Sequence, residues 1–402
     1  MNPPETRRRP FVVVIAATII VLIFVLVIRR DLTGALSGSP LDPSLTPRSA
    51  APTFTTSAST TSFRSPGRPV SASAERAGRS FLTAYVDPDG RVVRRDQNGD
   101  TVSEGQAYAM LVAVALRDRA TFEAVWSWTQ QNLMRPDHTL SWLWRDGAVV
   151  DPSSASDADL DAARALVMAG RVFGDEELTA AGVRLGQAIL DVETVSTPLG
   201  RIMVAGSWAR QDPYAYNPSY SSPVAFDLLH QASGDGRWTE LAAGSHRATR
   251  AFLDRAPLPP DWGQVNSTGQ ADPTAGAAGR GGEGVRYGYD AARLPLRYAE
   301  SCSPEDVALA ARLSAPLSQA PPHAAVRSLT GEAIGSEESV VAMAGLAAAH
   351  AAAGDWSGSK AALVASDGHQ QDQPSYYGGA WSALGRLLLT DRTLGGCPPL
   401  TS

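Results

Sequence analysis

The chain has 402 residues, 44% hydrophobic and 19% charged, which allows one sizeable folded domain and excludes a disordered or collagen-like polymer. The chain has 35 basic and 41 acidic residues. Residues 1–79 contain ten of the basic and four of the acidic residues, so the rest of the chain has 25 basic and 37 acidic residues and a net charge of −12. An acidic surface without a basic, aromatic-rich stripe repels phosphate backbones. The composition therefore disfavours nucleic acid as a partner and favours neutral or cationic substrates.

The first feature in chain order is an apolar run at 11–28 that contains no charged residue, Gly or Pro. Three Arg precede it in a short basic segment, 1–10, and two Arg follow it. As a helix it would extend roughly 27 Å, close to the thickness of the hydrocarbon core of a membrane. We predict an uncleaved, single-pass transmembrane anchor whose N-terminus is cytoplasmic. Cleavage near Ala35, followed by secretion, is the alternative.

A Ser/Thr/Pro-rich segment at 29–79 follows, and it has too few large apolar residues to form a core. We predict a flexible linker that tethers a domain at 80–395, with a short tail at 396–402, outside the membrane. Cys302 and Cys397 are the only two cysteines. Export would allow them to form a disulfide, and two unpaired thiols are the alternative.

Beyond residue 100, apolar residues recur every three or four positions, which predicts an all-α domain. Helices are expected at 103–117, 119–133, 156–173, 176–192, 222–232, 238–255, 290–300, 305–318, 336–353, 356–366 and 376–390. Alternating, strand-like patterns are confined to 91–95 and 148–151, which disfavours a parallel sheet. Because the helices have similar lengths and no fixed repeat, we expect antiparallel pairs that close into a barrel of about twelve helices.

The segment SEGQAYAM at 103–110 begins one of these helices. Ser103 and Gln106 are expected to form a capping box, which places Glu104 in the first turn. An acidic residue there ordinarily complements the helix dipole. The alternative is a catalytic acid, which would need burial or a neighbouring carboxylate to keep it protonated near neutral pH.

Three carboxylates at alternate positions occur in ASDADLD at 155–161. An EF-hand loop counted from Asp157 requires Gly at position 162 and Glu at position 168, but Ala162 and Met168 stand there, so a calcium loop is excluded. Helix capping is the ordinary explanation. The carboxylates exceed what capping needs, which makes this segment a candidate functional site.

A third candidate segment is GVRYGYDAAR at 284–293, a loop that leads into a helix. Asp290 lies at the expected cap, and Arg293, three residues later on the same face, would hold it ionised. An ordinary salt-bridged first turn is the alternative. The preceding glycines do not make a phosphate loop, because no apolar strand precedes them and no Gly-Lys-Ser/Thr follows.

Aromatic side chains gather in predicted loops beside polar residues. Four of them are predicted to be flat platforms for sugar rings, namely Trp142, Trp144, Trp208 and Tyr220. The six His are scattered, without a His-Glu-x-x-His motif or a Cys pair, and no Gly-x-Ser-x-Gly motif occurs. We therefore expect neither a metal nor another cofactor, and no serine hydrolase site.

Five segments together resemble the ordered motifs of glycoside hydrolase family 8. They are SEGQAYAM at 103–110, ASDADLDAARALVMAGRVF at 155–173, NPSY at 217–220, YDAARLPLR at 289–297 and PSYYGG at 374–379. The resemblance spans roughly 80–390 and implies an (α/α)6 barrel. It also implies an inverting, endo-acting hydrolase of polysaccharides, with β-1,4-glucan as the main substrate. Relatives occur in bacterial cellulose-synthesis operons, so a polysaccharide-synthesis complex is an expected partner.

The resemblance also implies roles for individual residues. Glu104 matches the general acid, Asp290 the general base of the cellulase-type subgroup, and Asp157 the carboxylate that binds the distorted sugar. Tyr289 and Arg293 would help to place the attacking water. A late tyrosine near that water is matched by either residue of a doublet, Tyr376 and Tyr377.

Two other functions stay open on the sequence. A chitosanase, or another β-glycan hydrolase of the same family, would suit the acidic domain. A membrane-tethered protein that only binds polysaccharide would need the aromatic platforms but not Glu104 and Asp290.

Overall fold

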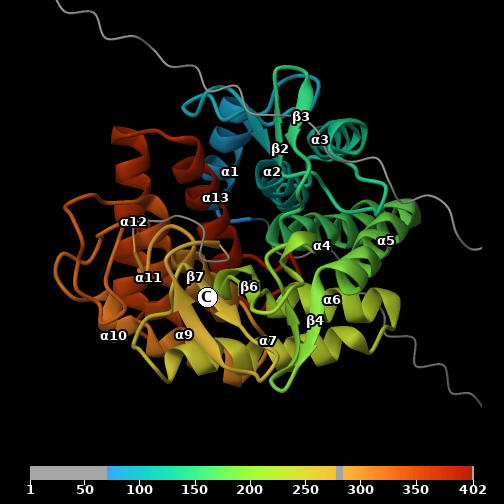
Figure 1. Ribbon diagram of the computed structural model, residues 1–402. Coiled ribbons are helices and arrows are strands. Elements are labelled where there is room, and N and C mark those ends of the chain that lie inside the picture. Colours follow the sequence, from blue (N-terminus) through green and yellow to red (C-terminus); the bar gives the residue numbers. More distant parts are fainter. Residues whose placement is uncertain (1–69, 278–283, 401–402) are drawn as a thin grey trace, which may run out of the picture. The chain divides into compact units, whose positions relative to one another are not determined.

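The computed structural model describes residues 70–277 and 284–400, and α-helices dominate this part of the chain (Figure 1). The predicted anchor at 11–28 and most of the predicted linker lie outside these residues. Within the described residues, none of the helices has the length and apolar character needed to cross a membrane.

The α-helices are α1 (Ala72–Tyr85), α2 (Ser103–Ala115), α3 (Arg119–Asn132), α4 (Ser156–Phe173), α5 (Glu176–Val192), α6 (Pro223–Ser233), α7 (Arg237–Leu253), α8 (Leu294–Ala299), α9 (Pro304–Arg312), α10 (Ser314–Leu317), α11 (Val340–Ala352), α12 (Trp356–Asp372) and α13 (Tyr376–Thr390). The predicted limits of α4, α5 and α13 are confirmed. The predicted helix at 305–318 is divided into α9 and α10, and the one at 290–300 begins with a 3-10 turn, η4 (Ala291–Arg293).

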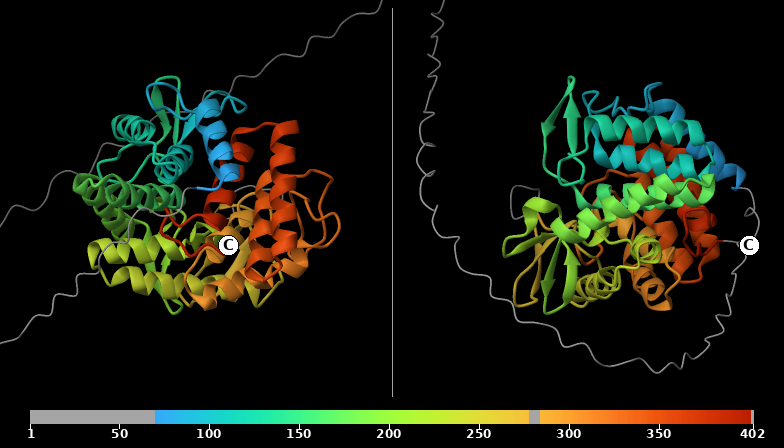
Figure 2. Two further views of the ribbon diagram at one scale, coloured as in Figure 1. Left: turned by 180° about the vertical axis from the view of Figure 1, so that it is seen from behind. Right: turned by 90° about the vertical axis from the view of Figure 1, so that its right-hand side faces the viewer.

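The helices form an inner and an outer set. Helices α2, α8, α11 and α13 are buried on almost all sides, and α4 is buried over most of its length, whereas α1, α3, α5, α7 and α12 bury one face only. Inner α4 packs on outer α5, inner α11 on α12 and inner α13 on α1, as Figures 1 and 2 show. A helix that is apolar all round requires such a cover of amphipathic helices.

Helix α1 corrects the predicted domain boundary. Residues up to 79 were expected in the linker, yet α1 starts at Ala72 and buries Phe81, Leu82 and Tyr85 against the main core. Ser71 caps it by accepting a hydrogen bond from the N–H of residue 74. The Ser- and Ala-rich first turn resembles linker sequence, and only its packing on α13 distinguishes it.

Short strands, which the sequence pattern largely missed, form three small antiparallel sheets. They are β1 (Thr101–Val102), β2 (Leu143–Arg145) and β3 (Ala148–Asp151), then β4 (Thr194–Thr197) and β5 (Gly200–Met203), and finally β6 (Tyr214–Tyr216), β7 (Trp262–Val265) and β8 (Ala271–Thr274). Of the two predicted strands, β3 is confirmed, and 91–95 forms only isolated bridges. The right-hand view of Figure 2 shows the strands along one side of the helices. Strands of two to four residues are too short to show alternation.

The C-terminal segment is fastened to the helices, so the predicted tail at 396–402 belongs at least in part to the domain. Cys302 and Cys397 form a disulfide with a Cα–Cα distance of 5.0 Å. The N–H of Cys397 donates to the carbonyl of Glu300 at 2.7 Å. The pairing that the sequence left open is therefore present in the structure.

Candidate active site

Three carboxylates from three helix starts meet at one guanidinium. Glu104 lies in the first turn of α2, Asp157 in the first turn of α4, and Asp290 directly before η4. Arg293, at the end of η4, contacts all three. Its Nη1 donates to Glu104 and, at 2.8 Å, to Asp157, and its Nη2 donates to Asp290 at 2.7 Å.

The capping explanation is wrong for Asp157 and Asp290, whereas the predicted ion pair between Asp290 and Arg293 is confirmed. Neither Asp157 nor Asp290 makes a side-chain capping hydrogen bond. The expected capping box is also absent, because Gln106 instead accepts a hydrogen bond from the N–H of Val92 at 2.6 Å and donates to Thr129 at 2.9 Å. With capping excluded, the contact with Arg293 is what holds the Asp157 and Asp290 carboxylates in place.

A row of buried ion pairs aligns the elements that carry the site. Asp157 on α4 pairs with Arg293, and one turn further Asp161 pairs with Arg297. A third pair, Arg164 with Glu300, is bidentate, with both N···O distances 2.7 Å. Because residue numbers rise together on both sides, α4 and the η4–α8 segment run in the same direction. The register between the two helices therefore sets where Arg293 meets Asp157.

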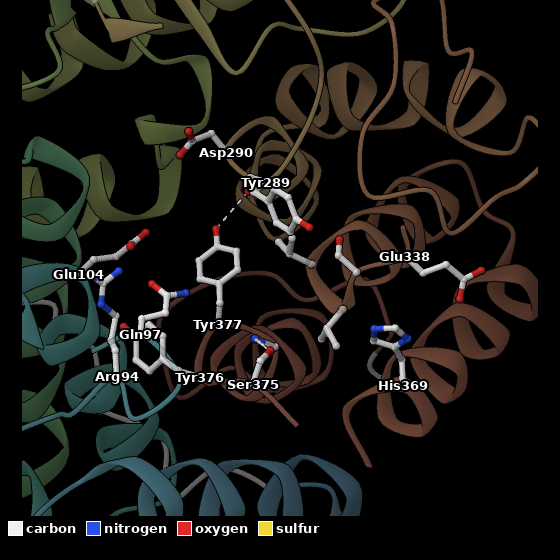
Figure 3. Close-up of a pocket in the computed structure, with 14 residues that line it drawn as sticks. Arg94, Gln97, Glu104, Tyr289, Asp290, Glu338, His369, Ser375, Tyr376 and Tyr377 are labelled. Atoms are coloured by element: carbon white, nitrogen blue, oxygen red, sulfur yellow. Dashed lines mark hydrogen bonds between the residues drawn. The ribbon is translucent and has the colours of Figure 1, made fainter. Parts of the chain in front are cut away.

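Glu104 and Asp290 are close enough to contact the same bound molecule. Two carboxylates that bind different nitrogens of one guanidinium have their nearest oxygens within about 8 Å of each other. Figure 3 shows both carboxyl groups at the same end of the pocket, turned toward each other. Their side chains are 25% and 31% exposed, whereas Arg293 is 2% exposed. The acids thus reach the pocket and the arginine lies behind them.

Burial raises the pKa of two of the carboxyls. The pKa of Asp157 rises to about 6, with Arg293 opposing the effect of burial and Glu104 adding to it. The pKa of Asp290 also rises to about 6 through burial, again opposed by Arg293 and increased by nearby carboxylates. Arg293 therefore does not lower the pKa of Asp290 as far as we expected. Near neutral pH Asp290 is still mostly ionised, as a base requires.

Both tyrosines of the doublet line the pocket, but their surroundings differ. Tyr376 is 1% exposed and packs on Phe81 and Tyr85 of α1. Tyr377 turns to the pocket, where its hydroxyl donates to the carbonyl of Tyr289 at 3.1 Å (Figure 3). The pocket has a volume of about 470 Å³, and Glu104, Asp290 and both rings of the Tyr289–Tyr377 pair lie along it. Tyr377 is thus the member of the doublet that lies beside Asp290.

The four predicted platforms differ in how much ring surface they leave open. Trp208 is 40% exposed, and its indole N–H donates to the carbonyl of Ser154, so its ring is both fixed and accessible. Trp142 is half-buried beside β2. The ring of Trp144 is covered by the guanidinium of Arg91, whose Cζ lies 4.4 Å from its centroid, and by Trp128.

Tyr220 and Tyr108 both lie against Arg293. The Arg293 Cζ is 5.3 Å from the ring centroid of Tyr220. The hydroxyl of Tyr108 donates to Glu104 and accepts from Arg293 Nη1 at 3.2 Å. Our sequence analysis did not single out Tyr108, although its position four residues after Glu104 puts it on the same helix face. In the described part of the chain, no group of three or more His, Cys, Asp or Glu side chains is arranged to hold a metal ion.

A second, fully buried carboxyl pair lies behind Asp157. Asp159 is 0% exposed and accepts a hydrogen bond from the N–H of Leu140 at 2.8 Å, and Glu193, also 0% exposed, lies close enough to raise the pKa of Asp159. Burial raises the pKa of both groups, that of Glu193 to about 7. At least one carboxyl of the pair must therefore stay protonated while both are buried in the core.

Replacing Glu193 by Gln is expected to make stability less sensitive to pH. The folded pKa of Glu193 is raised, so its contribution to stability is complete below its ordinary value of 4.5 and is lost as pH rises through about 7. When the pH rises from 5 to 8, the free energy of unfolding of Glu193→Gln should decrease by roughly 2–3 kcal/mol less than that of the wild type. Urea unfolding at both pH values measures this, with the exposed Glu240→Gln as control. Equal losses in all three proteins would contradict the interpretation.

Comparisons with known proteins bear on this geometry. The sequence model of Glycosyl hydrolases family 8 matches residues 67–309, a range that includes α1, Glu104, Asp157 and Asp290 but not the tyrosine doublet. An endoglucanase of Xanthomonas axonopodis pv. citri is 36% identical over 234 residues, which cover 54% of this chain and 58% of that protein. The chain thus spans little more than half the length of this relative.

Solved structures with the same fold extend the match toward the C-terminus. An endo-β-1,4-glucanase from Acetobacter xylinum has a TM-score of 0.65 at 26% identity, and the match covers 79% of this chain and 97% of that one. A β-1,3-1,4-glucanase from Paenibacillus sp. X4 has a TM-score of 0.70 at 19% identity, over 78% and 90% of the two chains. The second likeness concerns the fold alone.

Proposed function

Because this chain belongs to glycoside hydrolase family 8, we propose that it is an inverting endoglucanase that cleaves β-1,4-glucan, with Glu104 as general acid and Asp290 as general base. The observation that carries the proposal is that Glu104, Asp157 and Asp290 meet at the buried Arg293, and that Glu104 and Asp290 line the pocket beside it. Relatives named endoglucanases support the same class of substrate.

The separation of the two acids is compatible with inversion, which the family membership favours. An inverting glycosidase protonates the leaving oxygen with one carboxyl and activates water on the other sugar face with a second, roughly 6.5–9.5 Å away. A spacing of up to about 8 Å between Glu104 and Asp290 is compatible with that arrangement. The water would lie beside Asp290, close to the Tyr377 hydroxyl and Tyr289. Asp157 would bind a hydroxyl of the sugar at the cleavage point.

The inner and outer helices support an (α/α)6 barrel. The inner α4 and the η4–α8 segment run in the same direction, as inner helices of such a barrel do, and the outer helices α1, α3, α5 and α12 each cover an inner one. The pocket opens where α2 and η4 begin, which places all three acids at one end of the inner set.

We further propose that the domain works outside the cytoplasm, tethered by 11–28 and the linker. The Cys302–Cys397 disulfide supports an oxidising compartment. Secretion after cleavage is the alternative location. A tethered enzyme would be placed to trim a glucan that its own cell exports, so a polysaccharide-synthesis complex is the partner we propose.

The proposed substrate is tested by a reducing-sugar assay of residues 64–402, which include α1, on carboxymethylcellulose, lichenan, xylan and chitosan. We expect release of oligosaccharides from carboxymethylcellulose. Release from chitosan alone would replace the proposal with a chitosanase, which the acidic domain would suit. Tight binding without turnover on every polymer would instead indicate a polysaccharide-binding protein.

The activity is expected to fall on the acid side through the protonation of Asp290. Burial raises its pKa to about 6, so below that pH the base becomes protonated and cannot accept a proton from water. The kcat/KM on soluble glucan should decrease about tenfold per pH unit well below 6. A profile that stays flat from pH 7 to pH 4 would contradict Asp290 as the base.

A further inference from the structure

Asp261 lies directly before β7 and is 7% exposed, and its carboxylate faces the turn that carries Tyr289 and Asp290. Its Oδ1 accepts two backbone hydrogen bonds, from Gly288 at 2.7 Å and from Ala291 at 2.9 Å. These donors stand one residue before Tyr289 and one residue after Asp290. One carboxylate oxygen thus closes the turn around both residues.

The backbone of the same segment is held on both sides. The N–H of Asp261 donates to the carbonyl of Arg286 at 2.8 Å. On the other side Tyr287 and Arg327 exchange two backbone hydrogen bonds, of 2.9 and 2.8 Å. Residues 286–288 are therefore fixed between two neighbouring chain segments, and Asp261 extends this hold to residue 291.

Glycine at position 288 permits the close approach of the carboxylate. A Cβ at Gly288 would lie 2.6 Å from Oδ2 of Asp261, well inside van der Waals contact. Any larger residue would push the carboxylate away from the two N–H groups. The contact can therefore be disturbed from either side, by changing Asp261 or Gly288.

Asp261 also adds negative charge behind Asp290. Its carboxylate raises the pKa of Asp290, as Asp157 does, whereas Arg293 and the side chain of Asn217 lower it. Arg286 partly balances Asp261, with its Nε 3.4 Å from Oδ2.

We infer that Asp261 is a positioning residue of this enzyme, which holds Tyr289 and Asp290 at the cleavage point and places its own negative charge behind Asp290. The inference rests on the proposed function. Asp261 does not reach the reacting atoms, because its two hydrogen bonds go to the backbone beneath Asp290.

Steady-state kinetics of the full-length protein separate position from charge. Asp261→Ala removes both the hydrogen bonds to the turn and the negative charge. The kcat should therefore fall about 10²-fold, since a shift of about 1 Å in a catalytic group has that effect. KM should change less than about threefold, because glucan binding elsewhere in the cleft is untouched. Gly288→Ala should reproduce this loss while leaving the carboxylate in the chain.

Asp261→Asn is the conservative variant. Its side-chain oxygen can still accept both N–H groups, so kcat at pH 7 should stay within about tenfold of the wild type. Without the charge, the acid limb of kcat/KM should move to lower pH. Asp272→Asn, which removes an acid from neighbouring β8 where it pairs with Arg255, should match the wild type in every respect.

Unchanged kcat in Asp261→Ala, or an unmoved acid limb in Asp261→Asn, would overturn the inference. Hydrogen exchange over 286–291 tests the positioning without reference to activity. Faster exchange in folded Asp261→Ala than in the wild type supports it, and equal exchange overturns it. A wild-type protein that hydrolyses no glucan would refute the proposed function, while the exchange result would still decide the role of Asp261.

Discussion

Glu104→Gln and Asp290→Asn are each expected to reduce kcat on β-1,4-glucan by about 10²–10⁴-fold, the usual effect of losing a general acid or base. Both replacements are isosteric and keep hydrogen-bonding atoms next to Arg293, so the fold should persist. The loss therefore reports on proton transfer. The reducing-sugar assay measures it, and thermal unfolding checks that the variants are folded.

A substrate with a good leaving group distinguishes the loss of activity in Glu104→Gln from that in Asp290→Asn. An aryl cellobioside with an acidic phenol leaves without protonation, so it should restore most of the activity of Glu104→Gln but not that of Asp290→Asn. Glu123→Gln on α3, which is 50% exposed and pairs with Arg119, is the matched control and should be fully active. If either site variant retains most of its activity on glucan, the corresponding assignment is wrong.

Arg293→Met should abolish activity and also lower stability, because it leaves three carboxylates around a buried position without their shared cation. Removing one partner of a buried ion pair ordinarily costs about 3–5 kcal/mol. The loss should be largest at pH 7 and smaller at pH 5, where Asp157 and Asp290, whose pKa values are about 6, are protonated. Urea unfolding at the two pH values measures it.

Arg293→Lys refines this prediction. An ammonium keeps the charge but lacks the planar fork that reaches Glu104 and Asp290 through different nitrogens. It should recover part of the stability and little of the activity. Full activity in the lysine variant would mean that charge alone matters, and that the bridging geometry does not position the acids.

Arg293 shows why the site was only partly visible in the sequence. Its spacing from Asp290 predicted their ion pair, because residues three apart on a helix share a face. Nothing in that spacing predicted its contacts with Glu104 and Asp157, which lie 189 and 136 residues away. These contacts depend on the register between α4 and the η4–α8 segment, which is set by the buried pairs further along.

The sequence by itself determined most of the helices, since the three-to-four spacing of apolar residues is a local property; α4, α5 and α13 have the predicted limits. Through its motifs it also determined which acids to consider. Only the tertiary structure decided that α1 belongs to the domain, that Tyr377 and not Tyr376 lies beside Asp290, and that Asp261 closes the turn at Gly288. Each of these depends on packing between segments that are distant in the chain. Contacts of that kind produce no periodic pattern in the sequence of either segment.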